Sequence, residues 1–86
     1  MKNKFNFDTA TKLSLALNTC ATDIQVKNED MRNRYVSLNE SFRDPVYNEY
    51  QAEFAACDKS IKDACDLLNE LGAAILKYAD TLRESY

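Results

Sequence analysis

The scarcity of glycine and proline constrains this fold more than any other feature of the sequence. The 86 residues include one glycine, Gly72, and one proline, Pro45. Sheets with many tight turns need more of both residue types, whereas the interior of a long helix excludes them. The proline lies close to the midpoint, in the stretch "ESFRDPVYNEY". The sequence therefore predicts an all-α fold: one domain over 1–86, with two long helices and one sharp connection.

The half of the chain after Pro45 has the clearest periodicity. Its apolar residues recur at alternating spacings of three and four: Tyr47, Tyr50, Phe54, Cys57, Ile61, Ala64, Leu68, Leu71, Ile75, Tyr78 and Leu82. A period of 3.5 residues keeps one stripe of a helix against a partner helix along its length. We expect this helix over about 45–84, with Asp44 as its N-cap and Pro45 at the first helical position.

The half before the proline predicts a second helix, over about 9–41, capped by Asp8 or Thr9. Its apolar residues keep the same spacing, with one polar interruption: Ala10, Leu13, Leu17, Cys20, Ile24, then Met31, Tyr35, Leu38 and Phe42. If the chain folds back at 42–45, apolar residues meet at each level: Leu17 with Leu71, Leu13 with Ile75, Ile24 with Ile61 or Ala64, and Ala10 with Tyr78. This agreement predicts an antiparallel two-helix hairpin.

The hairpin is expected to have a partner, because two helices enclose only a thin core. A seam covered by one partner helix normally has charged flanks. Here the flanks of the second helix are small or apolar, with Cys65, Gly72 and Ala79 on one side. We therefore expect two hairpins to pair into a four-helix bundle. The residues predicted to contact the partner are Leu15, Leu67, Gly72, Ala74, Leu76 and Ala79.

The composition argues against several classes of function. With 11 Lys and Arg against 14 Asp and Glu, the net charge of −3 does not favour a nucleic-acid binder. The chain has no histidine, no Cys-x-x-Cys and no phosphate-binding glycine loop. We therefore expect no enzyme activity, no metal site and no cofactor.

The three cysteines, Cys20, Cys57 and Cys65, are an odd number and predict no disulfide framework. We expect them to act as small buried hydrophobes. A redox pair of Cys20 and Cys65 across the hairpin is the alternative.

The sequence also bears on location. No apolar run approaches the roughly 18 residues of a membrane span. The N-terminal "MKNKFNFD" has two lysines but no apolar stretch after them, unlike a classical signal peptide. We expect a cytoplasmic protein, or one exported by a route that does not read such a signal.

The layout of the chain resembles the Trp-x-Gly (WXG, ESAT-like) small proteins of type VII secretion. The segment "FRDPVYNEYQAEF" stands where that family has its Trp-x-Gly turn, with Phe42 at the Trp position and Asp44 at the Gly position. The run "LLNELGAAILKYADTLRESY" is similar to the second-helix tail of the family. The family's export signal, Tyr-x-x-x-Asp/Glu, is absent at Tyr78, because Leu82 stands at its acidic position.

The resemblance implies a member that travels with, or docks onto, a partner that carries the signal. The helical proteins associated with LXG-type toxins have that role, and they bind the helical N-terminal region of the toxin. The expected function is thus a non-catalytic type VII secretion-associated binding protein, a small secreted partner or an effector-targeting chaperone. Its partner would be a second copy, a related helical protein or a toxin's helical domain. The alternative is a cytoplasmic coiled-coil adaptor or regulator. At the turn, Phe42 and Tyr47 would be exposed contact residues or would cap the closed end.

Overall fold

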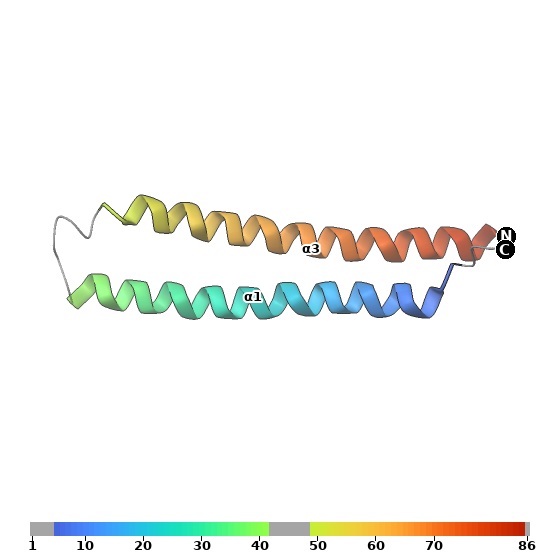
Figure 1. The fold of residues 1–86 in the computed structure, drawn as a ribbon, viewed down its shortest axis with the longest axis horizontal. Helices are drawn as coiled ribbons and strands as arrows, with labels where there is room; N and C mark the ends of the chain where they lie inside the picture. Colours follow the sequence, from blue (N-terminus) through green and yellow to red (C-terminus); the bar gives the residue numbers. More distant parts are fainter. Residues whose placement is uncertain (1–4, 42–48, 86) are drawn as a thin grey trace.

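Two antiparallel helices make up the part of the chain that the computed structural model describes, residues 5–41 and 49–85. Helix α1 spans Phe7–Ser41 and helix α3 spans Gln51–Ser85. They lie side by side along their lengths, with the start of α1 and the end of α3 at the same end of the molecule (Figure 1). The molecule is a rod of 64 × 19 × 17 Å. The predicted all-α, antiparallel hairpin is confirmed.

The start of α1 is capped by Asn6 rather than by Asp8 or Thr9. The side-chain Oδ1 of Asn6 accepts a hydrogen bond from the N–H of Thr9 at 2.9 Å. The backbone C=O of Asn6 accepts the first helical hydrogen bond, from the N–H of Ala10 at 3.0 Å. Together these are the contacts of an N-cap. Asp8 lies instead in the first turn, where its charge favours the helix N-terminus.

The start of α3 lies later than predicted. Glu49 and Tyr50 adopt a turn, and the helix begins at Gln51 rather than at Pro45. The C=O of Tyr50 accepts a hydrogen bond from the N–H of Phe54 at 2.9 Å, which opens the helical ladder there. The acidic residue of the first turn is then Glu53. The predicted turn residues lie outside the described residues: Phe42, Asp44, Pro45 and Tyr47.

The helices meet along stripes of small residues spaced seven apart. On α1, Ser14 and Ala21 are buried, and on α3 the stripe consists of Cys65, Gly72 and Ala79. A Cβ atom added at Gly72 would lie 3.2 Å from the backbone oxygen of Ser14, closer than ordinary van der Waals contact. The Oγ of Ser14 donates a hydrogen bond to the C=O of Gly72 at 2.8 Å. The backbones therefore approach too closely for a larger side chain to fit between them.

This seam corrects the predicted one. Cys65, Gly72 and Ala79, predicted to lie on a flank of α3, form the centre of the contact. Leu71 and Tyr78, predicted to lie in the seam, are 51% and 57% exposed. The reason is physical: the distance between two packed helices depends on the side chains at the contact, and small ones allow the closest approach. Leu71 and Tyr78 then lie beside the contact, whereas Ile61, Leu68 and Ile75 of the predicted seam are half-buried.

The predicted register between the helices agrees with the structure. Leu13 and Ile75 line one groove, and Ile24 and Ile61 line another. Near the turn, the ring of Tyr35 stacks on that of Phe54, with centroids 4.0 Å apart and planes 13° from parallel. The periodicity thus predicted the level at which residues meet. The face of each helix that it predicted for the contact differs from the observed one by part of a helical turn.

Candidate docking face

One long side of the hairpin, which we call the apolar face, carries exposed or half-buried apolar side chains from both helices. On α1 they are Leu13, Leu17, Cys20, Ile24, Met31 and Leu38, and on α3 they are Cys57, Ile61, Ala64, Leu71, Ala74, Ile75 and Tyr78. Several of these recur at intervals of seven, and an α-helix drifts only about 20° over that interval. They therefore point in nearly the same direction along the rod.

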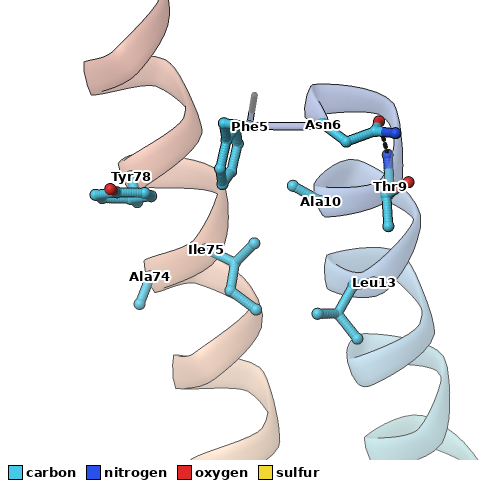
Figure 2. Close-up of a pocket in the computed structure, with 8 residues that line it drawn as sticks. All are labelled: Phe5, Asn6, Thr9, Ala10, Leu13, Ala74, Ile75 and Tyr78. Atoms are coloured by element: carbon cyan, nitrogen blue, oxygen red, sulfur yellow. Dashed lines mark hydrogen bonds between the residues drawn. The ribbon is translucent and has the colours of Figure 1, made fainter. Parts of the chain in front are cut away.

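Two grooves show that the apolar residues of α1 and α3 share one side of the molecule. The larger groove, of about 490 Å³, brings Ala10 and Leu13 of α1 together with Ala74, Ile75 and Tyr78 of α3 (Figure 2). The smaller groove, of about 210 Å³, is lined by Ile24, Lys27, Asn28, Met31 and Ile61. The first groove lies toward the chain ends and the second lies closer to the turn.

Aromatic contacts close the end of the hairpin beside the larger groove. The ring of Phe5 lies edge-on to that of Tyr78, with centroids 5.5 Å apart, and edge-on to that of Phe7 at 5.0 Å. Figure 2 shows the Phe5 ring between the two helices, at the end of the groove. The guanidinium of Arg83 lies 4.9 Å from the centre of the Phe7 ring, a cation–π distance. These contacts hold Phe5 and Phe7 against α3.

The apolar face is accessible in the single chain. Leu13 is 49% exposed, and Leu38, Leu71 and Tyr78 are exposed to a similar degree. Soluble monomeric proteins rarely expose a contiguous apolar patch of more than a few hundred Å², and larger patches mark sites of interaction. This face is therefore the part of the described surface best suited to contact another apolar surface.

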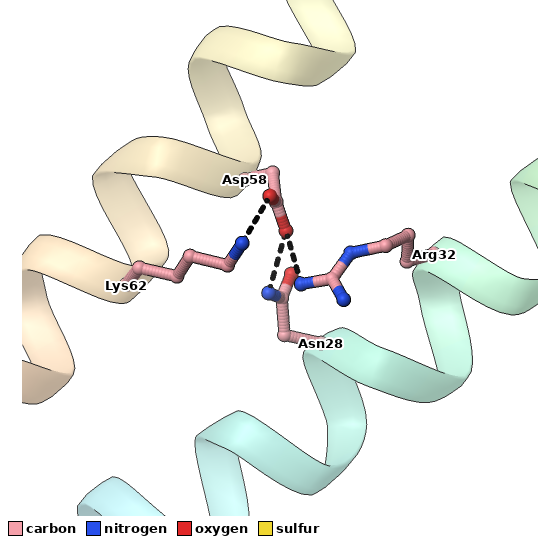
Figure 3. A network of polar contacts seen from close by, with 4 residues as sticks. All are labelled: Asn28, Arg32, Asp58 and Lys62. Carbon is pink, nitrogen blue, oxygen red and sulfur yellow. Dashed lines mark hydrogen bonds and ion pairs between the residues drawn. The ribbon is translucent and has the colours of Figure 1, made fainter.

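The opposite side of the hairpin carries a polar cluster organised around Asp58 (Figure 3). One carboxylate oxygen accepts hydrogen bonds from Asn28 Nδ2 at 2.8 Å and from Arg32 at 3.0 Å, and the other pairs with Lys62 at 3.1 Å. The hydrogen bond from Asn28, followed by those from Arg32 and Lys62, lowers the pKa of Asp58 to about 2. Because Asn28 and Arg32 belong to α1, the cluster ties α1 to α3 at one level.

A groove of about 430 Å³ beside this cluster has a mixed lining: Gln25, Asn28, Glu29, Arg32, Lys62 and Asp66. Both signs of charge are present, which suits a solvated surface better than a site for an anion or a cation. The two sides of the rod therefore differ in chemistry at the level of Asp58.

The six residues predicted to contact a partner are divided by the structure. Ala74 lines the larger groove of the apolar face, and Leu67 is strongly exposed. Leu15 is 65% exposed but lies about 200° around α1 from Leu13, on the other side of the helix. Leu76, one residue after Ile75, also turns away from the groove, by about 100°.

The other two predicted contact residues, Gly72 and Ala79, are buried between α1 and α3. They do not lie on an open surface, because the small-residue stripe is already covered by the chain's own first helix. The helix that contacts Gly72 is thus α1 of the same chain.

Sequence reasoning missed the contact between Asn28 and Asp58. A signal for it was present: Asn28 continues the spacing of seven from Ser14 and Ala21, and Asp58 lies seven residues before Cys65. The pattern was missed because Asn28 and Asp58 are polar, and the search for contact residues followed apolar side chains.

None of the three cysteines forms a disulfide in the structure. All three are free thiols; Cys20 and Cys57 are exposed, and Cys65 is fully buried. The Sγ of Cys65 lies 3.6 Å from the C=O of Ala21, to which its S–H donates. The prediction of a small buried hydrophobe fits Cys65 but is wrong for Cys20 and Cys57, which lie on the apolar face.

Within residues 5–41 and 49–85, no group of three or more Cys, Asp or Glu side chains is arranged to hold a metal ion. In the same ranges, neither helix has an apolar stretch long enough to cross a membrane. Comparison with family models, curated proteins and solved structures gave no match. The chemistry of the described surface therefore suits packing of the apolar face against another helical surface.

Proposed function

We propose that this chain is a non-catalytic binding protein of a type VII secretion system, either a small secreted partner or an effector-targeting chaperone. It acts by packing the apolar face of its hairpin against a helical partner, so that the two form a four-helix bundle. The observation that carries the proposal is the continuity of the apolar face across both helices. The pathway rests on the resemblance in layout to the Trp-x-Gly family.

The energy available on this face is sufficient for binding. Fully burying a leucine-sized side chain is worth about 1.5–3 kcal/mol. The five apolar residues Leu13, Met31, Leu38, Leu71 and Tyr78 are each between 38% and 57% exposed. Burying the exposed part of each of these side chains contributes about 1 kcal/mol to binding. For the face as a whole, the contribution is therefore several kcal/mol. A rigid hairpin also loses little conformational freedom when it binds.

A matched pair of substitutions on α1 tests the face. Leu13→Glu places a charge on the apolar face, and Leu15→Glu places the same charge on the other side of the same helix. Leu13 is 49% exposed and Leu15 is 65% exposed. Because neither side chain is buried, each variant is expected to fold. The tagged chain is expressed in its native cells, and the proteins that co-purify with it are quantified. Leu13→Glu should lose the helical partner and Leu15→Glu should keep it.

The same strains test the pathway. The amount of chain in the culture medium is compared between cells with an intact type VII ATPase and cells lacking it. Loss of export of the chain or of its partner in the ATPase mutant is expected. Partner binding that depends on Leu13, with no effect of the ATPase on either protein, would identify an adaptor outside secretion. Equal loss of the partner in both leucine variants would rule out the apolar face as the binding surface.

A further inference from the structure

We propose that the contact between Asn28 and Asp58 keeps the apolar face open, because it selects which sides of α1 and α3 pack against each other. Without this contact, the two helices would meet through their large apolar residues, and the apolar face would be buried inside the hairpin. Asn28 and Asp58 are thus positioning residues, which determine the surface that a partner meets. The consequence for binding rests on the proposed docking role of the apolar face, whereas the selection of the packing does not.

Each helix carries a second stripe through which it could pack. Leu13 directly precedes Ser14 in the α1 stripe of small residues, and Leu71 directly precedes Gly72 in the α3 stripe. Neighbouring residues on an α-helix point about 100° apart. Turning each helix by that angle would bury the large residues and expose the small ones, without changing which residues are level. Burial of apolar surface favours this rotated packing, since Leu13 and Leu71 are about half exposed in the structure.

The level of Asn28 is where the two packings differ most in electrostatic cost. In the structure, Asn28 is 5% exposed and its Nδ2 donates to Asp58 Oδ1 at 2.8 Å (Figure 3). In the rotated packing, the preceding residues Lys27 and Cys57 would take their places. Lys27 lines the smaller groove of the apolar face, with an exposed side chain. Rotation would therefore exchange a paired carboxylate for a lysine at the helix contact, and a buried charge without a partner is costly.

The hydrogen bond that Ser14 donates to α3 selects the packing less strongly. A serine or threonine hydroxyl can instead donate to the C=O one turn earlier in its own helix, as the hydroxyls of Thr11 and Thr22 do in α1. Ser14 would therefore keep a hydrogen bond after rotation. Asn28 and Asp58 would lose theirs, because both short side chains would turn out of the seam into solvent.

The environment of Asn28 suits a role in selection better than a role in stability. Its Oδ1 is buried and accepts no hydrogen bond from the residues that the structure describes. A buried acceptor without a donor lowers the stability of the fold. Buried polar residues in helix pairs are known to fix how the helices pair, at a cost in stability. Asn28 has both properties: it contacts a specific residue of α3, and it leaves one polar atom unsatisfied.

The three native cysteines report which sides of the helices meet. Cys65 lies in the seam and is buried, whereas Cys20 and Cys57 lie on the apolar face and are exposed. The rotated packing would reverse this pattern. The rate at which each thiol reacts with iodoacetamide is measured by peptide mass spectrometry, at several chain concentrations. Only burial against a partner depends on concentration, so the series separates it from burial within one hairpin.

Two variants remove the contact. Asp58→Lys deletes the carboxylate and places a cation beside Arg32 and Lys62, which lie 3.0 and 3.1 Å from the Asp58 oxygens in the wild type. Lys27→Leu with Asp58→Lys also removes the charge that opposes rotation. In this double variant, Cys65 should react at least about tenfold faster than in the wild type, and Cys20 and Cys57 at least about tenfold slower. Circular dichroism should show unchanged helicity.

Two further chains serve as controls. Asp63→Lys is the matched charge reversal, since Asp63 is exposed and pairs with Lys59 of its own helix at 2.9 Å; it should keep the wild-type thiol pattern. Arg32→Glu with Asp58→Lys restores an ion pair between α1 and α3 with the signs exchanged, and the new lysine can donate to Asn28 Oδ1. This rescue should restore the protection of Cys65.

The outcomes separate selection from stability and from docking. Continued protection of Cys65 in both Asp58→Lys chains would overturn the proposal. Lost helicity with all three thiols reactive in both chains would also overturn it, because the cluster would then contribute only stability. The partner that co-purifies with the wild type should be lost from the double variant and regained in the rescue. A reversed thiol pattern with the partner retained would uphold the selection of the packing and contradict the docking role of the apolar face.

Discussion

Replacing the single glycine with alanine tests the close contact that defines the hairpin. At an open helical position, Gly→Ala stabilises a helix by about 1 kcal/mol, because glycine has the greater freedom in the unfolded chain. At Gly72 the added Cβ would lie 3.1 Å from Asn18 Oδ1, 3.2 Å from the backbone oxygen of Ser14 and 3.3 Å from its Oγ. The exposed Asn18 side chain can rotate away. The Ser14 oxygen can move only if α1 moves with it.

The balance of these terms gives the sign of the effect. Adding a methyl group to a well-packed contact costs about 1–3 kcal/mol. A shift of α1 also weakens the hydrogen bond from Ser14 to Gly72, whose net worth is about 1 kcal/mol. Set against the propensity gain of about 1 kcal/mol, Gly72→Ala should destabilise the hairpin by about 1–2 kcal/mol. Gly72→Leu, with a much larger side chain, should separate the two helices.

The assay is urea unfolding followed by far-ultraviolet circular dichroism, at one fixed chain concentration. Ala73→Gly is the matched control: Ala73 is exposed, so this change measures propensity alone and should cost about 1 kcal/mol. If Gly72→Ala instead raised the free energy of unfolding by about 1 kcal/mol, the helices would not be in the close contact described, and the reasoning would fail.

Two further predictions concern Asp58 and Cys65. The hydrogen bond from Asn28, with those from Arg32 and Lys62, holds the pKa of Asp58 near 2, below its ordinary value of 3.8. The stabilisation from the Asp58 carboxylate should therefore be complete above about pH 4 and lost as the pH falls toward 2. In an acid titration of the free energy of unfolding, the Asp58→Asn variant should lose less stability over this window than the wild type. Identical titration curves for the two proteins would contradict the assignment. Cys65 should react with a thiol reagent only as urea opens the hairpin, since it is fully buried between the helices; rapid reaction in the native protein would show that this part of the seam is open.

The local features of the fold were predictable from the sequence. One proline and one glycine leave few places for a chain to turn, and spacings of three and four identify helices because they follow the 3.6-residue period. The register followed as well, because an antiparallel pair with one short connection fixes which residues are level. Leu13 with Ile75 and Ile24 with Ile61 are examples.

The side of α3 that faces α1 was not predictable in the same way. Two stripes lie next to each other on α3, one of large residues such as Leu71 and Tyr78 and one of small residues such as Gly72 and Ala79. Hydrophobicity favours the first stripe. Close approach of α1 favours the second stripe, and it depends on the residue of α1 at the same level. At Gly72 that residue is Ser14, whose small side chain donates a hydrogen bond to the C=O of Gly72. That fit is a property of both helices together, so neither helix pattern reveals it alone.

The candidate site lies on other residues of the hairpin than the sequence predicted. Residues assigned to the interior of the seam, including Leu13 and Leu71, form the open apolar face. Two residues assigned to partner contact, Gly72 and Ala79, belong to the interior. Because the stripe of small residues on α3 is buried inside the hairpin, the stripe of large residues is available to contact a partner.

The mass of the chain in solution tests the central claim most directly. Sedimentation equilibrium at micromolar concentration is run on the wild type, Leu13→Glu and Leu15→Glu, with helicity measured in parallel. A wild-type mass of twice 9.8 kDa is predicted. Leu15→Glu should keep that mass, and Leu13→Glu should fall to the mass of one chain with its helices intact. The same mass for all three proteins would contradict self-pairing through the apolar face.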